Sequence, residues 1–286
     1  MIPAEAIPHH ALESPHWEAR LSLEYEQRAE RSVLARRGHS GPLRVQRDLY
    51  PEGQGTCHTI VVHPPGGIAG GDSLAIDVSL GKGSAALLTT PGAGKWYRTH
   101  SRPASQALNF TVAPGASLEW LPQETILFDG ALAQMKTTVN LSGNATYTGW
   151  EILCFGRAAS CHPFDTGLLT QQTEIRNEHG CLWSEQARVA GSDPLFASPV
   201  GLAGRAVSAT LLAAGRDLSG DALAQCREID PGEGALAGLT RLPRVTIARW
   251  LGHSGEDARR YFVSLWRILR PVMRGSAAIE PRIWST

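Results

Sequence analysis

The sequence lacks several features that would place a protein in a class at once. Its 286 residues carry 27 basic and 27 acidic side chains, so the formal net charge is zero. No run of about 18 apolar residues occurs, and residues 1–17 do not combine a basic start with an apolar stretch. Zero net charge removes the broad attraction between basic proteins and nucleic acids or anionic membranes. We therefore expect a soluble, cytoplasmic protein that binds neither nucleic acid nor membrane.

A cysteine framework is also lacking. The five cysteines are odd in number, and no two have the CxxC spacing of a zinc or redox site. Cys154, Cys161 and His162 form a conceivable cluster for a soft metal, but their spacing matches no standard site. Reduced thiols are predicted instead of disulfides.

Catalytic and nucleotide-binding signatures are missing as well. The chain has no GxSxG or HExxH motif, and GGIAGG at 66–71 has the wrong glycine spacing for a dinucleotide-binding fold. The segment TTPGAGKWYR at 89–98 ends like a phosphate-binding loop. However, Thr89 stands where that loop needs a glycine, and Trp96 replaces the hydroxyl residue that would bind Mg²⁺. A nucleotide-binding role is therefore not predicted.

The chain does contain a succession of short strand-like segments. They are rich in β-branched and aromatic residues and are separated by Gly, Pro or Asn: 56–63, 74–80, 85–90, 106–112, 117–121, 135–141, 145–155 and 168–176. Their spacing leaves no room for intervening helices. We predict a mainly β fold, an irregular β-helix-like or multi-sheet arrangement of many short strands. No linker divides the chain, so a flexible segment 1–16 and a single domain 17–286 are expected.

Two helices are predicted in the C-terminal third. Ser219 can cap a helix over SGDALAQCREI, and Ser254 with Asp257 gives the capping pattern of a second helix that ends at Pro271. The second helix carries an apolar stripe, which is more often core than a contact surface. The segment 206–215 fits either a strand or a helix.

Several polar residues stand in settings that suggest a function. The loop HPPGGIAGGD at 63–72 needs positive φ angles at several glycines and presents His63 and Asp72. Glu151 interrupts an apolar strand, where an acid requires a partner or a water-filled cavity. Glu124 and Asp129 lie at strand ends. Imidazole and carboxylate groups bind divalent cations, but a structural turn and ion pairs with arginines explain the same pattern.

In the segment 95–98 of the incomplete phosphate-loop motif, successive side chains are expected to point in opposite directions. Lys95, Tyr97 and Arg98 are expected to form an exposed contact patch, whereas Trp96 points inward. A β-rich hydrolase that uses Glu124 and Asp129 as an acid pair is the enzymatic alternative, although no spacing defines its reaction.

Together, five motifs resemble the urease accessory protein D family (UreD, called UreH in some bacteria). They are HPPGGIAGGD at 63–72, TTPGAGKWYR at 89–98, LEWLPQETILFDGA at 118–131, WEILCFGRAA at 150–159 and RIWST at 282–286. The resemblance extends from about residue 17 to the C-terminus. Gly94, Trp96 and the stretch SCHP at 160–163 depart from the common family pattern.

The resemblance implies a non-enzymatic chaperone of urease maturation. Family members bind apo-urease and the accessory protein UreF, which recruits the GTPase UreG, and the assembly delivers Ni²⁺ and supports lysine carbamylation. The implied fold is an irregular β-helix-like arrangement with a few helices. No tightly bound cofactor is implied, Ni²⁺ is held transiently, and a homodimer is compatible with the resemblance. The GTPase partner also explains the incomplete phosphate loop.

A protein that delivers nickel must release it, which favours dispersed carboxylate and imidazole groups over a closed cysteine site. We therefore hypothesise that His63, Asp72, Glu124, Asp129 and Glu151 include the groups of an internal nickel path.

A second hypothesis concerns the C-terminal half. Partner binding is assigned to the 254–270 helix and the 200–215 segment, with Trp250 and Trp266 as anchors, although tryptophan in such segments is more often core. A protein-binding scaffold without any metal role is the alternative to the nickel path.

Overall fold

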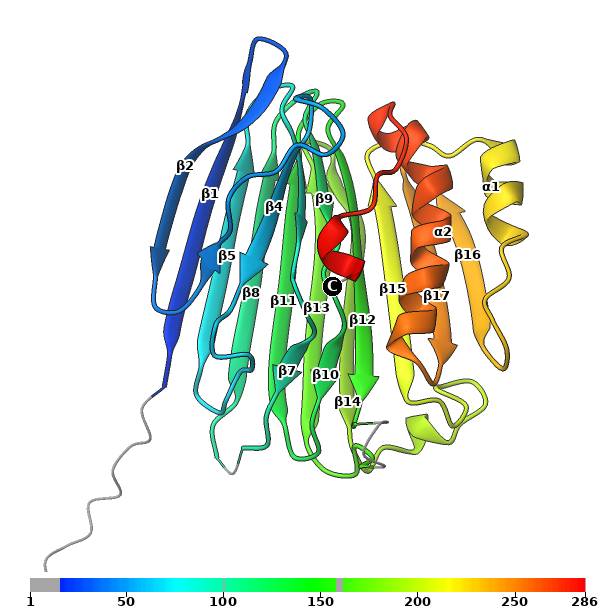
Figure 1. Cartoon of the computed structure of the whole chain (residues 1–286). Helices are drawn as coiled ribbons and strands as arrows, with labels where there is room; N and C mark the ends of the chain where they lie inside the picture. Colours follow the sequence, from blue (N-terminus) through cyan, green and yellow to red (C-terminus); the bar gives the residue numbers. More distant parts are fainter. Residues whose placement is uncertain (1–15, 100, 158–161, 286) are drawn as a thin grey trace, which may run out of the picture.

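Two β-sheets lie face to face and form the body of the molecule (Figure 1). The computed structural model describes residues 16–99, 101–157 and 162–285. The seven-stranded sheet contains, in spatial order, β14 (Gly180–Ala190), β13 (Leu168–Asn177), β11 (Leu132–Leu141), β8 (Ala104–Val112), β5 (Ser73–Leu80), β1 (Glu18–Arg28) and β2 (Arg31–Ser40). The ten-stranded sheet contains β16 (Leu236–Leu242), β17 (Val245–Gly252), β15 (Val207–Ala214), β12 (Thr146–Phe155), β9 (Ser117–Trp120), β6 (Ala85–Thr89), β4 (Cys57–Val62) and β3 (Arg44–Val45), with β10 (Thr125–Leu127) and β7 (Gly94–Trp96) joined beside β12.

Through the middle of the chain, the long strands alternate between the two sheets. Neighbours within each sheet are parallel there: β1, β5, β8, β11 and β13 in one sheet, and β4, β6, β9 and β12 in the other. Antiparallel strands complete both sheets at their edges. The result is a β-solenoid-like fold, which confirms the predicted fold class.

All eight predicted strand segments lie on strands of the structure, and the ambiguous segment 206–215 contains β15. The structure adds strands that the sequence reading did not assign, among them β1, β2, β14, β16 and β17. Several of these carry many exposed polar residues at the edges of the sheets. Residues 1–15 of the expected N-terminal segment lie outside the described residues.

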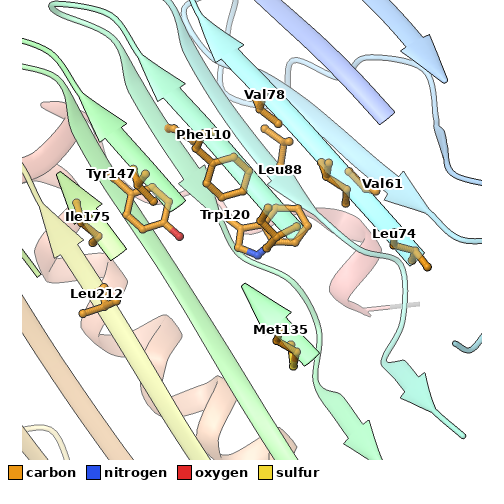
Figure 2. Packing of buried hydrophobic residues seen from close by; sticks show 14 of the residues in the cluster. Val61, Leu74, Val78, Leu88, Phe110, Trp120, Met135, Tyr147, Ile175 and Leu212 are labelled. Atoms are coloured by element: carbon orange, nitrogen blue, oxygen red, sulfur yellow. The ribbon is translucent and has the colours of Figure 1, made fainter. Parts of the chain in front are cut away.

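The main core lies between the two sheets (Figure 2). Alternate residues of each strand point into it, as the period of two in a β-strand requires. Phe110 of β8 lies 5.9 Å from the ring of Trp120 on β9 and 6.0 Å from that of Tyr147 on β12. Aromatic side chains of opposite sheets thus contact one another across the gap.

A second core forms where helix α2 (Gly255–Arg274) covers the outer face of β12, β15 and β17 (Figure 1). Helix α1 (Gly220–Arg227) lies beside it. Both predicted N-caps are confirmed: the hydroxyl groups of Ser219 and Ser254 each accept a backbone hydrogen bond at 3.2 Å. Among the residues that the structure describes, neither α-helix combines the length and the apolar character needed to cross a membrane.

The expectation that Pro271 ends the second helix is wrong. Helix α2 continues to Arg274 and ends at Gly275, whose left-handed φ of 83° is favourable for glycine. Proline removes one amide donor, but its carbonyl still accepts, here from the Gly275 amide at 3.0 Å. Met273 is buried, and the Arg274 guanidinium donates to the Gly55 carbonyl at 2.9 Å. These tertiary contacts hold the last turn in place.

A buried ionic cluster attaches α2 to the ten-stranded sheet. Arg270 of α2 donates to Glu119 of β9 at 3.0 Å and to Glu52 at 2.7 Å. Glu119 also accepts from the Trp266 indole at 2.6 Å, and Glu52 contacts the His58 imidazole at 2.6 Å. Each charge in this cluster has a partner, which buried charges require.

Residues 282–285 of the C-terminal motif contact the 89–98 motif. The indole of Trp284 donates to the Thr89 hydroxyl at 2.8 Å, and that hydroxyl donates to the Leu121 carbonyl at 2.6 Å. The Trp284 ring lies 5.6 Å from that of Trp150 and 6.0 Å from that of Trp266. Two motifs far apart in the sequence therefore meet beneath α2.

Candidate functional site

Four of the five sequence motifs lie side by side. The loop 63–72 joins the sheet through Ile68, whose amide donates to the Lys95 carbonyl at 2.7 Å and whose carbonyl accepts from Tyr97 at 2.9 Å. Strand β7 then pairs with β10, and β10 pairs with β12. Gly66 and Gly71 adopt the expected positive φ angles, 74° and 93°, which turn the loop onto β7. The motifs thus form one wall of the molecule.

Behind this wall lies a cavity of about 950 Å³ between the two sheets. Both sheets line it, from the loops around His63 and Lys95 to the strands β14 and β17. Such a volume lies at the upper end of the range of small-molecule pockets. Three of the five candidate path residues line it: His63, Glu124 and Glu151.

Glu151 points from β12 into the space between the sheets. Its neighbours Trp150 and Ile152 face α2 instead, because successive side chains of a strand alternate. The carboxylate accepts a hydrogen bond from the Gln171 amide of β13, on the opposite sheet. Burial, aided by the negative charge of Glu185, raises the pKa of Glu151 to about 7. An amide and a cavity, not an arginine, therefore accommodate this acid.

Two further charged residues of this region were not predicted from the sequence. Glu185 of β14 and Arg249 of β17 form an ion pair at 2.7 Å that joins the two sheets, and both line the cavity. Arg249 also donates to the Thr210 hydroxyl at 3.0 Å. The alternation of β14 places Glu185 and Ala187 on the cavity side, but the polar run 184–186 interrupts the apolar pattern that would have revealed this strand in the sequence.

His63 also lines the cavity. Its Nε2 is buried and has no hydrogen-bond partner among the residues that the structure describes. Burial lowers the pKa of the imidazole, and the charge of Asp72 opposes this effect. A neutral imidazole with a free nitrogen is the form that binds a metal ion.

Glu124 lies between the cavity and the start of α2. Its carboxylate forms an ion pair with Arg259 at 3.5 Å. A Cβ atom at Gly255 would come within 2.6 Å of the Glu124 Cγ and 3.1 Å of the Cys154 Sγ. The helix start and this part of the cavity wall are therefore in close contact.

Asp72 and Asp129 do not line the cavity. Asp72 is buried and accepts hydrogen bonds from the amides of Trp17 and Ala69, both at 2.8 Å. Asp129 accepts from the amide and hydroxyl of Thr166 at 2.7 and 2.8 Å and pairs with Arg98. Both carboxylates stabilise loops. Asp129 and Glu124 also have separate partners, so the structure does not join them as the acid pair of a hydrolase.

The predicted contact residues fall into two groups. Lys95, Tyr97 and Arg98 are at least partly exposed, and Tyr97 packs edge-on against Phe128 at 5.2 Å. Trp250 and Trp266, in contrast, are only 1% and 0% exposed. These two tryptophans belong to the core under α2, so we leave them out of the contact surface.

The described cysteines, Cys57, Cys154, Cys181 and Cys226, are free thiols. Cys161 lies outside the described residues, so the cluster with Cys154 and His162 is not placed. Within the described ranges, no group of three or more His, Cys, Asp and Glu side chains is arranged to hold a metal ion.

Comparison with known proteins identifies the family. A model of the UreD urease accessory protein family matches residues 18–285, which include both sheets, α2 and the cavity. The chain belongs to the UreD family. The urease accessory protein UreD of Dechloromonas aromatica (strain RCB) is 51% identical over 276 residues, 96% of each chain. UreD of Azoarcus sp. (strain BH72) is 49% identical over 272 residues, 95% of each chain. UreD of Janthinobacterium sp. (strain Marseille) is 45% identical over 271 residues, which cover 94% of this chain and 92% of the relative.

Membership of the UreD family gives the chain the role of a urease accessory protein. Motifs singled out from the sequence build one wall of the cavity. The cavity is therefore the candidate functional site.

Proposed function

We propose that this UreD protein is a non-enzymatic chaperone that passes Ni²⁺ through the intersheet cavity to apo-urease. The observation that carries the proposal is Glu151, an acid that faces the cavity between the sheets and whose hydrogen-bond partner, within the described part of the chain, is the Gln171 amide alone. An acid in such a place is costly to the fold. A cationic cargo that passes through the cavity would use it.

The donor groups along the cavity suit this cargo. The free Nε2 of His63 is an imidazole ligand, and Glu124, Glu151 and Glu185 supply carboxylates. Imidazole binds Ni²⁺ well, and carboxylates bind divalent cations more weakly. Dispersed groups of this kind favour passage over retention.

We further propose that the cation passes within a complex. UreF and, through UreF, the GTPase UreG are the partners, and apo-urease receives the ion. Lys95, Tyr97 and Arg98 are the contact candidates, because they lie on or next to β7, whose loop lines the cavity. A partner bound there would connect with the cavity.

Co-expression of the urease subunits and the other accessory proteins, with and without this chain, tests the proposal. Nickel bound to purified urease and the rate of urea hydrolysis are measured. We expect Glu151→Ala to reduce both toward the values found without the chain. Glu24→Ala is the matched control, because Glu24 is an exposed strand acid paired with Arg36. This control should keep wild-type values.

Pull-down of the urease subunits, UreF and UreG separates the alternatives, and light scattering reports whether the chain forms a homodimer. Glu151→Ala should bind its partners normally, since the residue lies inside the molecule. If this variant activates urease as well as the wild type does, the nickel path is rejected and the scaffold alternative is accepted. Equal activation without the chain would reject both.

A further inference from the structure

An arginine stands where a passing cation would bind. The Arg249 guanidinium lies 2.7 Å from the Glu185 carboxylate, and the two side chains are 45% and 28% exposed. The pair therefore lies where the cavity meets solvent, and it bridges β17 of one sheet and β14 of the other. An arginine has only donor groups and stays protonated, so it cannot itself bind a metal ion.

The strand register brings this pair next to Glu151. Glu151 of β12 lies directly opposite Thr210 of β15, and Thr210 lies opposite Arg249 of β17. Arg249 donates to the Thr210 hydroxyl at 3.0 Å, which holds the guanidinium beside the cross-strand neighbour of Glu151. Glu151 and Glu185 thus lie near one another across the cavity, with one fixed positive charge beside them.

Arg249 contacts Oε1 of Glu185, so a divalent cation that coordinates this oxygen must displace Arg249. Partly exposed ion pairs of this type are weak, so the displacement is feasible. The same positive charge repels a cation that stays near Glu151. Arg249 therefore lowers the affinity of the cavity for the cation without blocking the passage.

We propose that Arg249 is an internal competitor for the cation: it pairs with Glu185 when the cavity is empty and keeps nickel binding weak enough for release. This proposal rests on the proposed function. It assigns to Arg249 a positioning role toward Glu185, not contact with the ion.

Titration of the purified full-length chain with Ni²⁺, in competition with a coloured chelator, tests the proposal. Arg249→Met keeps the aliphatic stem and removes the charge. We expect it to bind Ni²⁺ about two- to fivefold more tightly than the wild type, the range that the loss of a weak ion pair implies. Arg249→Lys keeps the charge and should bind like the wild type. Adding Glu185→Gln to Arg249→Met should abolish the gain.

Arg36→Met is the matched control, because Arg36 forms a comparable pair with Glu24 at 3.2 Å on the outer surface. It should leave the Ni²⁺ affinity unchanged. Wild-type affinity in Arg249→Met, with weaker binding in Glu151→Gln, overturns this inference and leaves the proposed function intact. If the wild-type chain binds no Ni²⁺, both this inference and the proposed function are overturned. The same holds if Glu151→Gln and Glu185→Gln bind Ni²⁺ as tightly as the wild type does. Circular dichroism of the same samples shows whether each variant is folded. If Arg249→Met is misfolded, Arg249→Gln, which also removes the charge, replaces it.

Discussion

Three acids of this protein show how differently a β-sheet can accommodate a carboxylate. Glu119 is paired with Arg270 and the indole of Trp266, and Asp72 accepts two backbone amides. Glu151 faces the cavity and accepts from the Gln171 amide, its single hydrogen-bond partner among the described residues. The charge of each of the first two acids is met by several donors. Glu151 is the acid whose position the fold does not require.

The pH dependence of stability follows from this difference. The pKa of Glu151 is about 7 in the folded protein and has an ordinary value near 4.5 when the chain is unfolded. Between these values the folded state binds more protons, so the free energy of unfolding decreases as the pH rises. Below the lower value the residue has no effect, and above pH 7 its destabilisation is complete. Glu151→Gln should therefore stabilise the protein by about 1–3 kcal/mol at pH 8 and hardly at pH 4.5.

Urea unfolding of both proteins from pH 4.5 to pH 8 measures this effect. Glu24→Gln, at an exposed acid, is the control and should follow the wild-type profile. Parallel profiles for Glu151→Gln and the wild type would show that Glu151 has an ordinary pKa.

At the scale of elements, α2 depends on one buried arginine. Arg270→Met leaves Glu119 and Glu52 buried without their cationic partner, which typically costs about 3–5 kcal/mol. Arg267→Met is the control on the same helix, because Arg267 pairs with Glu280 on the surface and should contribute less than about 1 kcal/mol. Urea unfolding compares the two variants. Equal losses would mean that the buried cluster does not hold the helix.

The two helix starts give a second matched pair. Gly220 and Gly255 are the first residues of α1 and α2. A Cβ atom at Gly220 meets nothing within 4 Å, so Gly220→Ala should stabilise the protein by about 0.4–1 kcal/mol. At Gly255 the Cβ atom would collide with Glu124 and Cys154, so Gly255→Ala should destabilise it by about 1–3 kcal/mol. Melting temperatures of the two variants should shift in opposite directions, and a rise for both would contradict the close contact.

Elements were predictable from the sequence where local signals were strong. The central strands were found because they are apolar and bounded by turns, and both N-caps were found from serine followed by an acid or a helical pattern. Edge strands such as β2, β14 and β16 were not, since exposed faces leave no apolar alternation. The turn after Pro271 was missed because tertiary contacts of Arg274 and Met273 maintain it.

At the scale of the whole molecule, the candidate site depends on the register between the sheets. Sequence patterns singled out His63, Glu124 and Glu151, which line the cavity, but also Asp72 and Asp129, which do not. An acid in a loop and an acid in a cavity look alike in a sequence. Glu185 and Arg249 meet only because β14 and β17 lie on opposite sheets at the same height, and no local signal encodes that pairing.

A substitution on one of the two facing sheets can fill the cavity while its charged residues stay unchanged. Ala187 of β14 lines the cavity, whereas Gln186 next to it is exposed on the outer face. Ala187→Phe should fill part of the space of about 950 Å³ and obstruct the passage, while Gln186→Phe adds the same ring outside.

We expect Ala187→Phe to lower the nickel content of co-expressed urease and its rate of urea hydrolysis to the values of Glu151→Ala. Partner binding in pull-downs should stay normal, because the outer surface is unchanged. Gln186→Phe should activate urease like the wild type. If the inward ring leaves activation intact in a folded protein, the cation does not travel between the sheets; if both variants lose activation together with partner binding, β14 acts as a contact surface instead.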